Sequence, residues 1–354
     1  MTRLALWLAL VGALLFGSPP ATAQAKLPIR IGFQTGEVNV LLSHAVAAGL
    51  FEKEGLAVTL AQFPAGPAML PALAAGEVDL AWMGEFPAVT GYANGLPIEI
   101  LFMERIDATN VRLVANPAAG IASPTDLKGK RIGVAIGSTS HYHLLRALSQ
   151  AGLKAEDVRL VNLTPANMPP AYAAGQIDAA FVWEPNVGAM ERQGAKAIAT
   201  TKSLGMITGG VWVARKPFVT GSPETVQRFL KAWDAAQNAY AADPAGVRAA
   251  EAKRIGMSGP DFDALVAGQS VAHPSFRQTL TADFLGAPGQ EGESRLMKHL
   301  HGIAAFLVGE KRIQAPPADW AGLFDTKPIQ AYLAGASAGV AKGVAKGVAK
   351  GASQ

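Results

Sequence analysis

One polar segment of the chain has the composition of an anion-binding turn. Arg131 to Ala151 reads as a short strand at Ile132 to Ile136, a tight turn at Gly137, three hydroxyl residues at 138–140 and an amphipathic helix. Hydroxyls at a helix start accept hydrogen bonds from free backbone N–H groups, and these groups with the positive end of the helix dipole attract an anion. The segment therefore predicts either a site for the acidic head group of a small solute or an ordinary helix cap.

Three other polar turns also follow apolar segments, at 34–37, 84–86 and 183–185. In open α/β sheets, ligands bind beyond the carboxyl ends of the strands, so all four turns are expected to line one cleft. For Glu85 and Glu184, a place in the first turn of a helix is the alternative interpretation. The predicted ligand-binding residues are Gln34, Thr35, Glu37, Gly84, Glu85, Ser138, Thr139, Ser140, His141, Tyr142, Trp183 and Glu184. No catalytic residue, metal site or cofactor is predicted.

The elements that position these turns alternate between strand and helix. Strands are expected at Pro28–Gln34, 58–63 and 78–83, and helices at 41–50 and 67–75. Because strand, helix and strand follow one another in this rhythm, each sheet is expected to be mostly parallel, with helices on both faces.

The same pattern occurs a second time about 100 residues later. Pro71–Phe86 and Pro170–Pro185 each contain a helix that ends at Ala-Ala-Gly. An acid, Asp79 or Asp178, follows the glycine by three positions in both. A repeat of this length indicates two similar lobes and not a solenoid. The expected boundaries are 26–107 and 212–333 for the first lobe and 108–211 for the second, so the chain crosses twice at a hinge.

The ends of the chain predict export and an unstructured tail. Arg3 precedes an uncharged apolar segment and then small residues near 21–25, so 1–25 reads as a cleavable signal peptide. The chain has no cysteine, which excludes disulfides and a lipid-anchored cysteine. Residues 334–354 contain a Gly-Val-Ala-Lys repeat and are expected to be disordered. The net charge of the chain is +4, and without the charges of these two ends the remaining residues are close to neutral. We therefore expect no basic face for nucleic acid.

The sequence carries none of the common enzyme signatures. It has no His-Glu-x-x-His motif, no Gly-x-Ser-x-Gly elbow, no Walker loop and no dinucleotide fingerprint. A receptor that binds a small solute is the favoured interpretation. A dehydratase-like or lyase-like enzyme with Glu85 or Glu184 as general base remains an alternative. A carboxylate needs a raised pKa for this role, and burial would raise it.

Several motifs together resemble the periplasmic substrate-binding proteins of ABC importers for nitrate, aliphatic sulfonates and taurine, and the taurine-binding branch is the most similar. The motifs are Gln34-Thr35, the segment 138–142 with Leu144-Leu145, Val161-Asn162-Leu163, Val182-Trp183 and Val211-Trp212-Val213. The resemblance implies the two-lobed periplasmic binding protein fold of type II, a ligand cleft between the lobes, and a monomer that delivers its solute to an inner-membrane permease and its ATPase. It also implies that the hydroxyl turn holds a sulfonate-like group.

The chain departs from the taurine branch at three positions. That branch commonly has Ser where this chain has Glu85, Ala where it has Glu184, and an acid where it has Gly210. We therefore expect Glu85 or Glu184 to bind the ammonium group of a zwitterionic solute in place of the missing acid. A thiamine-pyrimidine precursor or another nitrogenous solute is the remaining alternative for the ligand.

Overall fold

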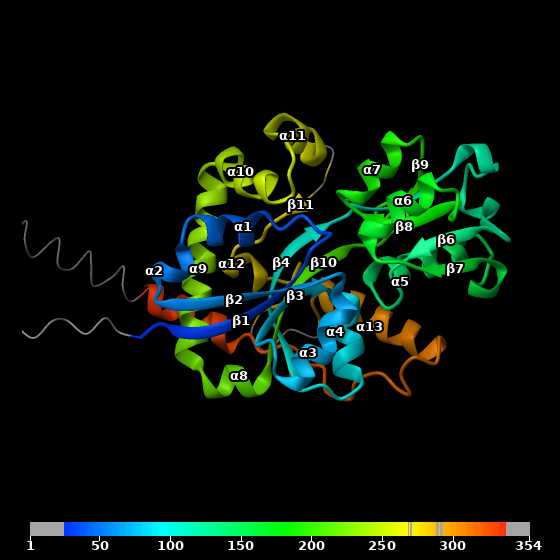
Figure 1. Cartoon of the computed structure of the whole chain (residues 1–354). Helices are drawn as coiled ribbons and strands as arrows, with labels where there is room; N and C mark the ends of the chain where they lie inside the picture. Colours follow the sequence, from blue (N-terminus) through cyan, green and yellow to red (C-terminus); the bar gives the residue numbers. More distant parts are fainter. Residues whose placement is uncertain (1–24, 268, 270, 288–289, 291–292, 338–354) are drawn as a thin grey trace, which may run out of the picture.

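Two β-sheets organise the part of the chain that the computed structural model describes, which is residues 25–267, 269, 271–287, 290 and 293–337. We call each sheet, with the helices packed on it, a lobe (Figure 1). The strand order is β11-β4-β10-β3-β1-β2 in the first lobe and β7-β6-β8-β5-β9 in the second. The expected α/β architecture with two sheets flanked by helices is confirmed.

The elements have the following bounds. The strands of the first lobe are β1 (Leu27–Gln34), β2 (Leu56–Phe63), β3 (Leu80–Gly84), β4 (Ile98–Asp107), β10 (Thr208–Arg215) and β11 (Val271–Ala272). Those of the second are β5 (Val111–Ala115), β6 (Arg131–Val134), β7 (Arg159–Asn162), β8 (Ala179–Trp183) and β9 (Lys196–Thr200). The helices of the first lobe are α1 (Val40–Ala47), α2 (Leu50–Lys53), α3 (Met69–Ala75), α4 (Glu85–Ala93), α8 (Lys216–Gly221), α9 (Pro223–Ala242), α10 (Pro244–Arg254), α11 (Gly259–Ala267), α12 (Phe276–Thr279) and α13 (Arg295–Gly309). The second lobe has α5 (Thr139–Gln150), α6 (Met168–Ala173) and α7 (Asn186–Arg192).

Both sheets are mixed, which differs from the mostly parallel sheets expected. Among the labelled strands of the described residues, pairing is parallel within the strand–helix–strand units, where β1 pairs with β2 and β3, and β6 pairs with β7 and β8. The strands that carry the chain between the lobes pair antiparallel, namely β4 and β10 in the first sheet and β5 and β9 in the second. The alternation of strand and helix in the sequence identified the parallel units but did not predict the antiparallel direction of these returning strands.

The chain passes between the lobes in two short segments, 108–110 and 201–207. Thr208 of β10 lies opposite Asp107 of β4, so the two passages run side by side. Residues 208–211 therefore belong to the first sheet, whereas the expected boundary placed them in the second lobe. The expected single helix at 41–50 is also interrupted, because Gly49 adopts a left-handed conformation with φ 63° between α1 and α2.

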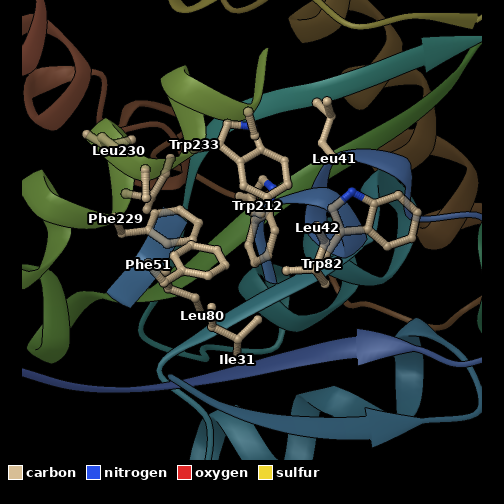
Figure 2. Close-up of a cluster of buried hydrophobic side chains, with 14 of the residues drawn as sticks. Ile31, Leu41, Leu42, Phe51, Leu80, Trp82, Trp212, Phe229, Leu230 and Trp233 are labelled. Carbon is tan, nitrogen blue, oxygen red and sulfur yellow. The ribbon is translucent and has the colours of Figure 1, made fainter. Parts of the chain in front are cut away.

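The first sheet has a separate apolar core on each face. On one face, β1 packs against α1 and α9, and the aromatic side chains include Trp212 and Trp233, whose ring centroids are 4.9 Å apart (Figure 2). On the other face, Ala81 and Met83 pack against α3, α4 and α13. Neighbouring residues of β3 point to opposite faces, so one short strand contributes to both cores and ends at the edge that faces the second lobe.

The two ends of the chain are described only in part. The predicted signal peptide, apart from residue 25, and the repeat at 338–354 lie outside the described residues. Residues 334–337, which were assigned to a disordered tail, continue a helix that begins at residue 327. Within the described ranges, no helix has both the length and the apolar character needed to cross a membrane.

Candidate functional site

A narrow cavity of about 30 Å³ lies between the lobes. This volume holds only a few water molecules, so the lobes must separate further to admit an organic solute. The lining residues come from both lobes and are Gln34, Glu37, Gly66, Trp82, Gly84, Pro87, Arg105, Val111, Ser138, Thr139, Ser140, Trp183, Thr208, Gly209 and Gly210. Seven of the twelve predicted ligand-binding residues are among them, namely Gln34, Glu37, Gly84, Ser138, Thr139, Ser140 and Trp183.

The second lobe contributes the start of α5 to the cavity. Gly137 has a φ of 86°, which is favourable only for glycine, and it turns the chain from β6 into the helix. Ser138 is the N-cap, and its Oγ accepts from the backbone N–H of His141 at 3.4 Å. The backbone N–H groups of Thr139 and Ser140 have no acceptor among the described residues, as expected for the first turn of a helix. These free donors at the positive end of α5 face the cavity.

The three hydroxyl groups of this turn are not equivalent. Ser138 Oγ donates to the carbonyl oxygen of Ala135 at 2.7 Å, and Thr139 Oγ1 donates to Glu85 Oε2 at 3.5 Å. Ser140 Oγ forms one side-chain hydrogen bond within the described part of the chain, to Ser138 Oγ at 2.9 Å. Because Ser138 already donates its only proton to Ala135, Ser140 is the donor in this contact, and its hydroxyl can turn its proton to a ligand in exchange for the bond to Ser138.

The first lobe contributes an amide and an ion pair. Gln34 Oε1 accepts from the backbone N–H of Gly66 at 2.8 Å, which directs the amide nitrogen of Gln34 to the cavity. Glu37 Oε1 accepts from Arg105 Nη2 at 3.0 Å and from Asn110 Nδ2 at 3.3 Å. This wall therefore presents a neutral donor and a buried carboxylate.

Several buried charges surround Glu37. Burial raises the pKa of Glu37 to about 7 and that of Asp107 to about 6, and Arg105 opposes both shifts. Burial alone would lower the pKa of Arg105, but the carboxylates of Glu37, Asp107 and Glu104 raise it above its ordinary value. One guanidinium thus serves several acids, and it also stacks over the ring of Trp82 at 4.9 Å.

Five predicted residues do not line the cavity. The main chain and hydroxyl of Thr35 bind the carbonyl of Phe63 in an exposed position. The ring of His141 accepts from the N–H of Gly137, and burial, with Arg312, lowers its pKa to about 4. Tyr142 stacks on Phe86 at a centroid distance of 5.3 Å, within the apolar core under α13.

The two glutamates predicted to bind an ammonium group are both occupied by protein donors. Glu85 Oε2 accepts from the N–H of Gly209 at 3.0 Å, and Glu85 Oε1 lies 3.1 Å from Nε2 of His299. Glu184 binds Arg112 through one oxygen and the N–H of Gly188, at 2.9 Å, through the other. Glu184 lines a separate groove beside α7 and α11, since neighbouring residues at the end of β8 point to opposite faces of the sheet.

Arg105 and Trp82 are the main cavity residues that the sequence did not identify. Both lie inside strands whose other residues are almost all buried, so neither has a local pattern that marks a site. Gly209 and Gly210 at the second passage did carry a signal, as paired glycines before an apolar strand. Among the described residues, no group of three or more His, Asp or Glu side chains is placed to hold a metal ion.

Comparison with known proteins identifies the family of this chain. A family model described as NMT1/THI5 like matches residues 40–247. The chain belongs to this family. The taurine-binding periplasmic protein of Escherichia coli (strain K12) is 31% identical to it over 319 residues, which cover 85% of this chain and 95% of that protein.

Solved structures support the same grouping. The alkanesulfonate-binding protein SsuA from Xanthomonas axonopodis pv. citri, bound to MOPS, matches with a TM-score of 0.67 and 27% identity, and the match covers 84% of this chain and 99% of SsuA. The desulfurization enzyme DszB shares the fold, with a TM-score of 0.63, 17% identity, and coverage of 87% of this chain and 99% of that enzyme. The expected family and the periplasmic binding protein fold are confirmed.

Proposed function

We propose that this chain is the periplasmic solute-binding component of an ABC importer and that it binds a small sulfonate-type solute between its lobes. One observation carries the proposal: the hydroxyl-rich start of α5 opens into the inter-lobe cavity with unpaired N–H donors. The similarity to a taurine-binding and an alkanesulfonate-binding protein supports the same ligand class. Periplasmic location, a monomeric state and delivery to an inner-membrane permease are parts of this proposal.

The start of α5 suits a tetrahedral oxyanion group. The N–H groups of Thr139 and Ser140 and the hydroxyl of Ser140 supply donors on one side of such a group. Hydrogen bonds to an anion are about twice as strong as those between neutral groups, and the dipole of α5 adds to them. The amide nitrogen of Gln34 supplies a donor from the opposite lobe, so a bound anion contacts both lobes.

Binding without turnover is the activity that these groups support. Each of the two acids considered as a general base, Glu85 and Glu184, already accepts hydrogen bonds through both oxygens or faces a histidine. A free base within reach of the substrate is a requirement for proton transfer. The likeness to DszB concerns the fold alone, and both similar binding proteins favour a receptor.

Calorimetric titration of the mature chain with alkanesulfonates tests this function. Ser140→Ala removes the rotatable hydroxyl and is expected to weaken sulfonate binding by about two- to tenfold, the effect of one hydrogen bond. Ser149→Ala, at the exposed far end of the same helix, is the matched control and should bind like the native chain. If the native chain binds no alkanesulfonate or aminosulfonate at millimolar concentration, the proposed function is wrong.

A further inference from the structure

The two ends of the inter-lobe cavity differ in charge. The end formed by the second lobe is the start of α5, with free N–H donors and no side-chain charge at Ser138, Thr139 or Ser140. At the other end, one guanidinium, Arg105, lies between the carboxyl groups of Glu37 and Asp107, at 3.0 Å and 3.5 Å. This small group carries a formal charge of minus one when both acids are ionised. A solute that spans the cavity thus meets donors at one end and excess negative charge at the other.

Glu37 is the acid that presents this charge to the cavity. Its side chain is about 5% exposed, and both donors that hold it, Arg105 and Asn110, bind the same oxygen, Oε1. Oε2 has no donor among the described residues and is not enclosed by protein atoms, which leaves it open to the cavity that Glu37 lines. The carboxylate is therefore held in place through one oxygen and accessible through the other.

The other buried acids nearby have no comparable free oxygen in the cavity. Glu85 and Glu184 are bound as described above. Glu104 accepts from Trp82 Nε1 at 2.9 Å through Oε2, and its Oε1 lies 3.0 Å from Nδ1 of His273. Asp107 does not line the cavity.

Arg105 is an unsuitable partner for a ligand anion despite its place in the wall. Its Nη1 donates to the carbonyl of Val38 at 3.0 Å, its Nη2 donates to Glu37, and its Nε lies 3.5 Å from Asp107 Oδ2. An anion at this end would have to displace a carboxylate or lie beside two of them, and like charges repel. Arg105 acts as a positioning residue that orients Glu37.

We propose that Glu37 selects solutes that carry an ammonium group opposite their sulfonate, by accepting a hydrogen bond from that ammonium through Oε2. The inference deepens the proposed function and depends on it. It replaces the expectation, drawn from the sequence, that Glu85 or Glu184 binds the ammonium. The preferred ligand class is a short aminosulfonate, whose two charges match the two ends of the cavity.

A matched pair of ligands separates this selection from sulfonate binding itself. Taurine and ethanesulfonate share the sulfonate and the two-carbon chain, and only taurine carries an amine. Glu37→Gln keeps the shape of the side chain and an acceptor for Arg105, and it is expected to weaken taurine binding by about 10- to 100-fold, the range of a charge-assisted hydrogen bond. Ethanesulfonate binding should stay unchanged or improve.

Glu99→Gln is the control for this variant. Glu99 is a buried glutamate of β4, its pKa is also raised to about 7 by burial, and it lies outside the cavity. Taurine affinity that is retained in Glu37→Gln, or an equal loss for both ligands, would overturn the inference while the proposed function stands. If the native chain binds neither ligand, the proposed function fails and the inference fails with it.

The pH dependence of the native chain gives a second test that needs no variant. Only the ionised form of Glu37 attracts an ammonium, and its pKa is raised to about 7 by burial, against the effects of Arg105 and Asn110 and with that of Asp107. Arg254 also contacts this residue, since its Nη2 donates to the main-chain carbonyl of Glu37 at 2.7 Å. Taurine affinity should therefore rise between about pH 6 and pH 8, while ethanesulfonate affinity should not. Parallel profiles for the two ligands would contradict the inference.

Discussion

Trp183 donates its indole N–H to the carbonyl oxygen of Gly36 at 2.7 Å, from the second lobe to the first. Asn186 Nδ2 donates to the same oxygen at 3.2 Å. Gly36 lies in the turn after β1, between the cavity residues Gln34 and Glu37. These two bonds hold the lobes together at the rim of the cavity, so lobe closure and ligand enclosure share one contact.

Trp183→Phe should weaken ligand binding without unfolding either lobe. The variant keeps an aromatic ring but loses the donor to Gly36, and a hydrogen bond of this kind contributes about two- to tenfold in affinity. Calorimetry with the preferred sulfonate measures the loss. Because the bond forms only when the lobes meet, the loss should appear as faster dissociation, and an unchanged dissociation rate in stopped-flow fluorescence would contradict this.

Gly84→Ala should oppose closure by adding a single methyl group. Gly84 has an ordinary extended conformation, with φ −68° and ψ 159°, so alanine causes no backbone strain there. A Cβ at this position would overlap Thr139 Oγ1 of the opposite lobe. The variant should keep the melting temperature of the ligand-free chain. It should bind every ligand more weakly, because part of the binding free energy is then spent on bringing the added methyl group and Thr139 together as the lobes close.

Gly309→Ala serves as the control for that substitution. A Cβ at Gly309, the last residue of α13, would meet no atom within 4 Å. Its ligand affinity should equal that of the native chain. Small-angle scattering should show Gly84→Ala in a more extended state than the control in the presence of ligand, and identical profiles would rule out an effect on closure.

The sequence predicted the parts of the fold that depend on local, repeated patterns. Asp79 and Asp178 were identified as equivalent positions of the sequence repeat, and each accepts three hydrogen bonds from one arginine. Asp79 binds the backbone N–H, Nε and Nη2 of Arg30 at 3.0, 2.9 and 2.6 Å. Asp178 binds the same atoms of Arg131 at 2.8, 3.1 and 2.6 Å. The repeat was visible in the sequence because the same arginine and aspartate occur at nearly the same separation, 49 and 47 positions, in both lobes.

The remaining site residues depend on long-range pairing that local patterns do not encode. Arg105 and Glu37 are 68 positions apart in the sequence. Arg105 lies on β4, which is not a neighbour of β1 in the sheet because β10 and β3 lie between them, so no local pattern links the two residues. Glu184 follows β8 at the correct edge of its sheet, but a shift of one residue along a strand turns the side chain to the other face. A rule based on strand ends therefore found the right turns and could not say which side chain of each turn faces the ligand.

Asp79→Asn should destabilise the first lobe in a pH-dependent way. Burial alone would raise the pKa of Asp79, but hydrogen bonds from Arg30 and Arg215 outweigh it and lower the pKa below its ordinary value of 3.8. The ionised form therefore stabilises the fold above about pH 4, and this contribution is lost as the pH falls through the pKa of the folded state. At pH 7 the loss should be about 1.5–3 kcal/mol of unfolding free energy, as for a hydrogen bond to a charged group.

Urea unfolding of Asp79→Asn and Asp178→Asn at pH 7 and pH 3.5 checks this prediction. Asp178 lacks a second arginine partner among the described residues, and its side chain is 18% exposed against 6% for Asp79. Asp178→Asn should therefore cost less at pH 7. A difference between Asp79→Asn and the native chain that does not shrink at acidic pH would show that the loss comes from packing.

Arg105→Met removes the one guanidinium that lies between Glu37 and Asp107. Breaking a buried pair by removing one partner typically costs about 3–5 kcal/mol, because the other charge stays buried without compensation. Both acids already have a raised pKa, to about 7 and about 6, and losing Arg105 raises each further. A folded-state pKa above the unfolded value means that the folded chain binds more protons, so the stability of Arg105→Met should fall as the pH rises from about 5 to 8.

Adding Glu37→Gln removes one of the uncompensated charges, so the double variant should be more stable than Arg105→Met at pH 8, and the two should converge at pH 5. Chemical unfolding of the three variants measures this, and a double variant as unstable as Arg105→Met at pH 8 would show that Arg105 stabilises the fold through Trp82 and Val38 and not through the acids.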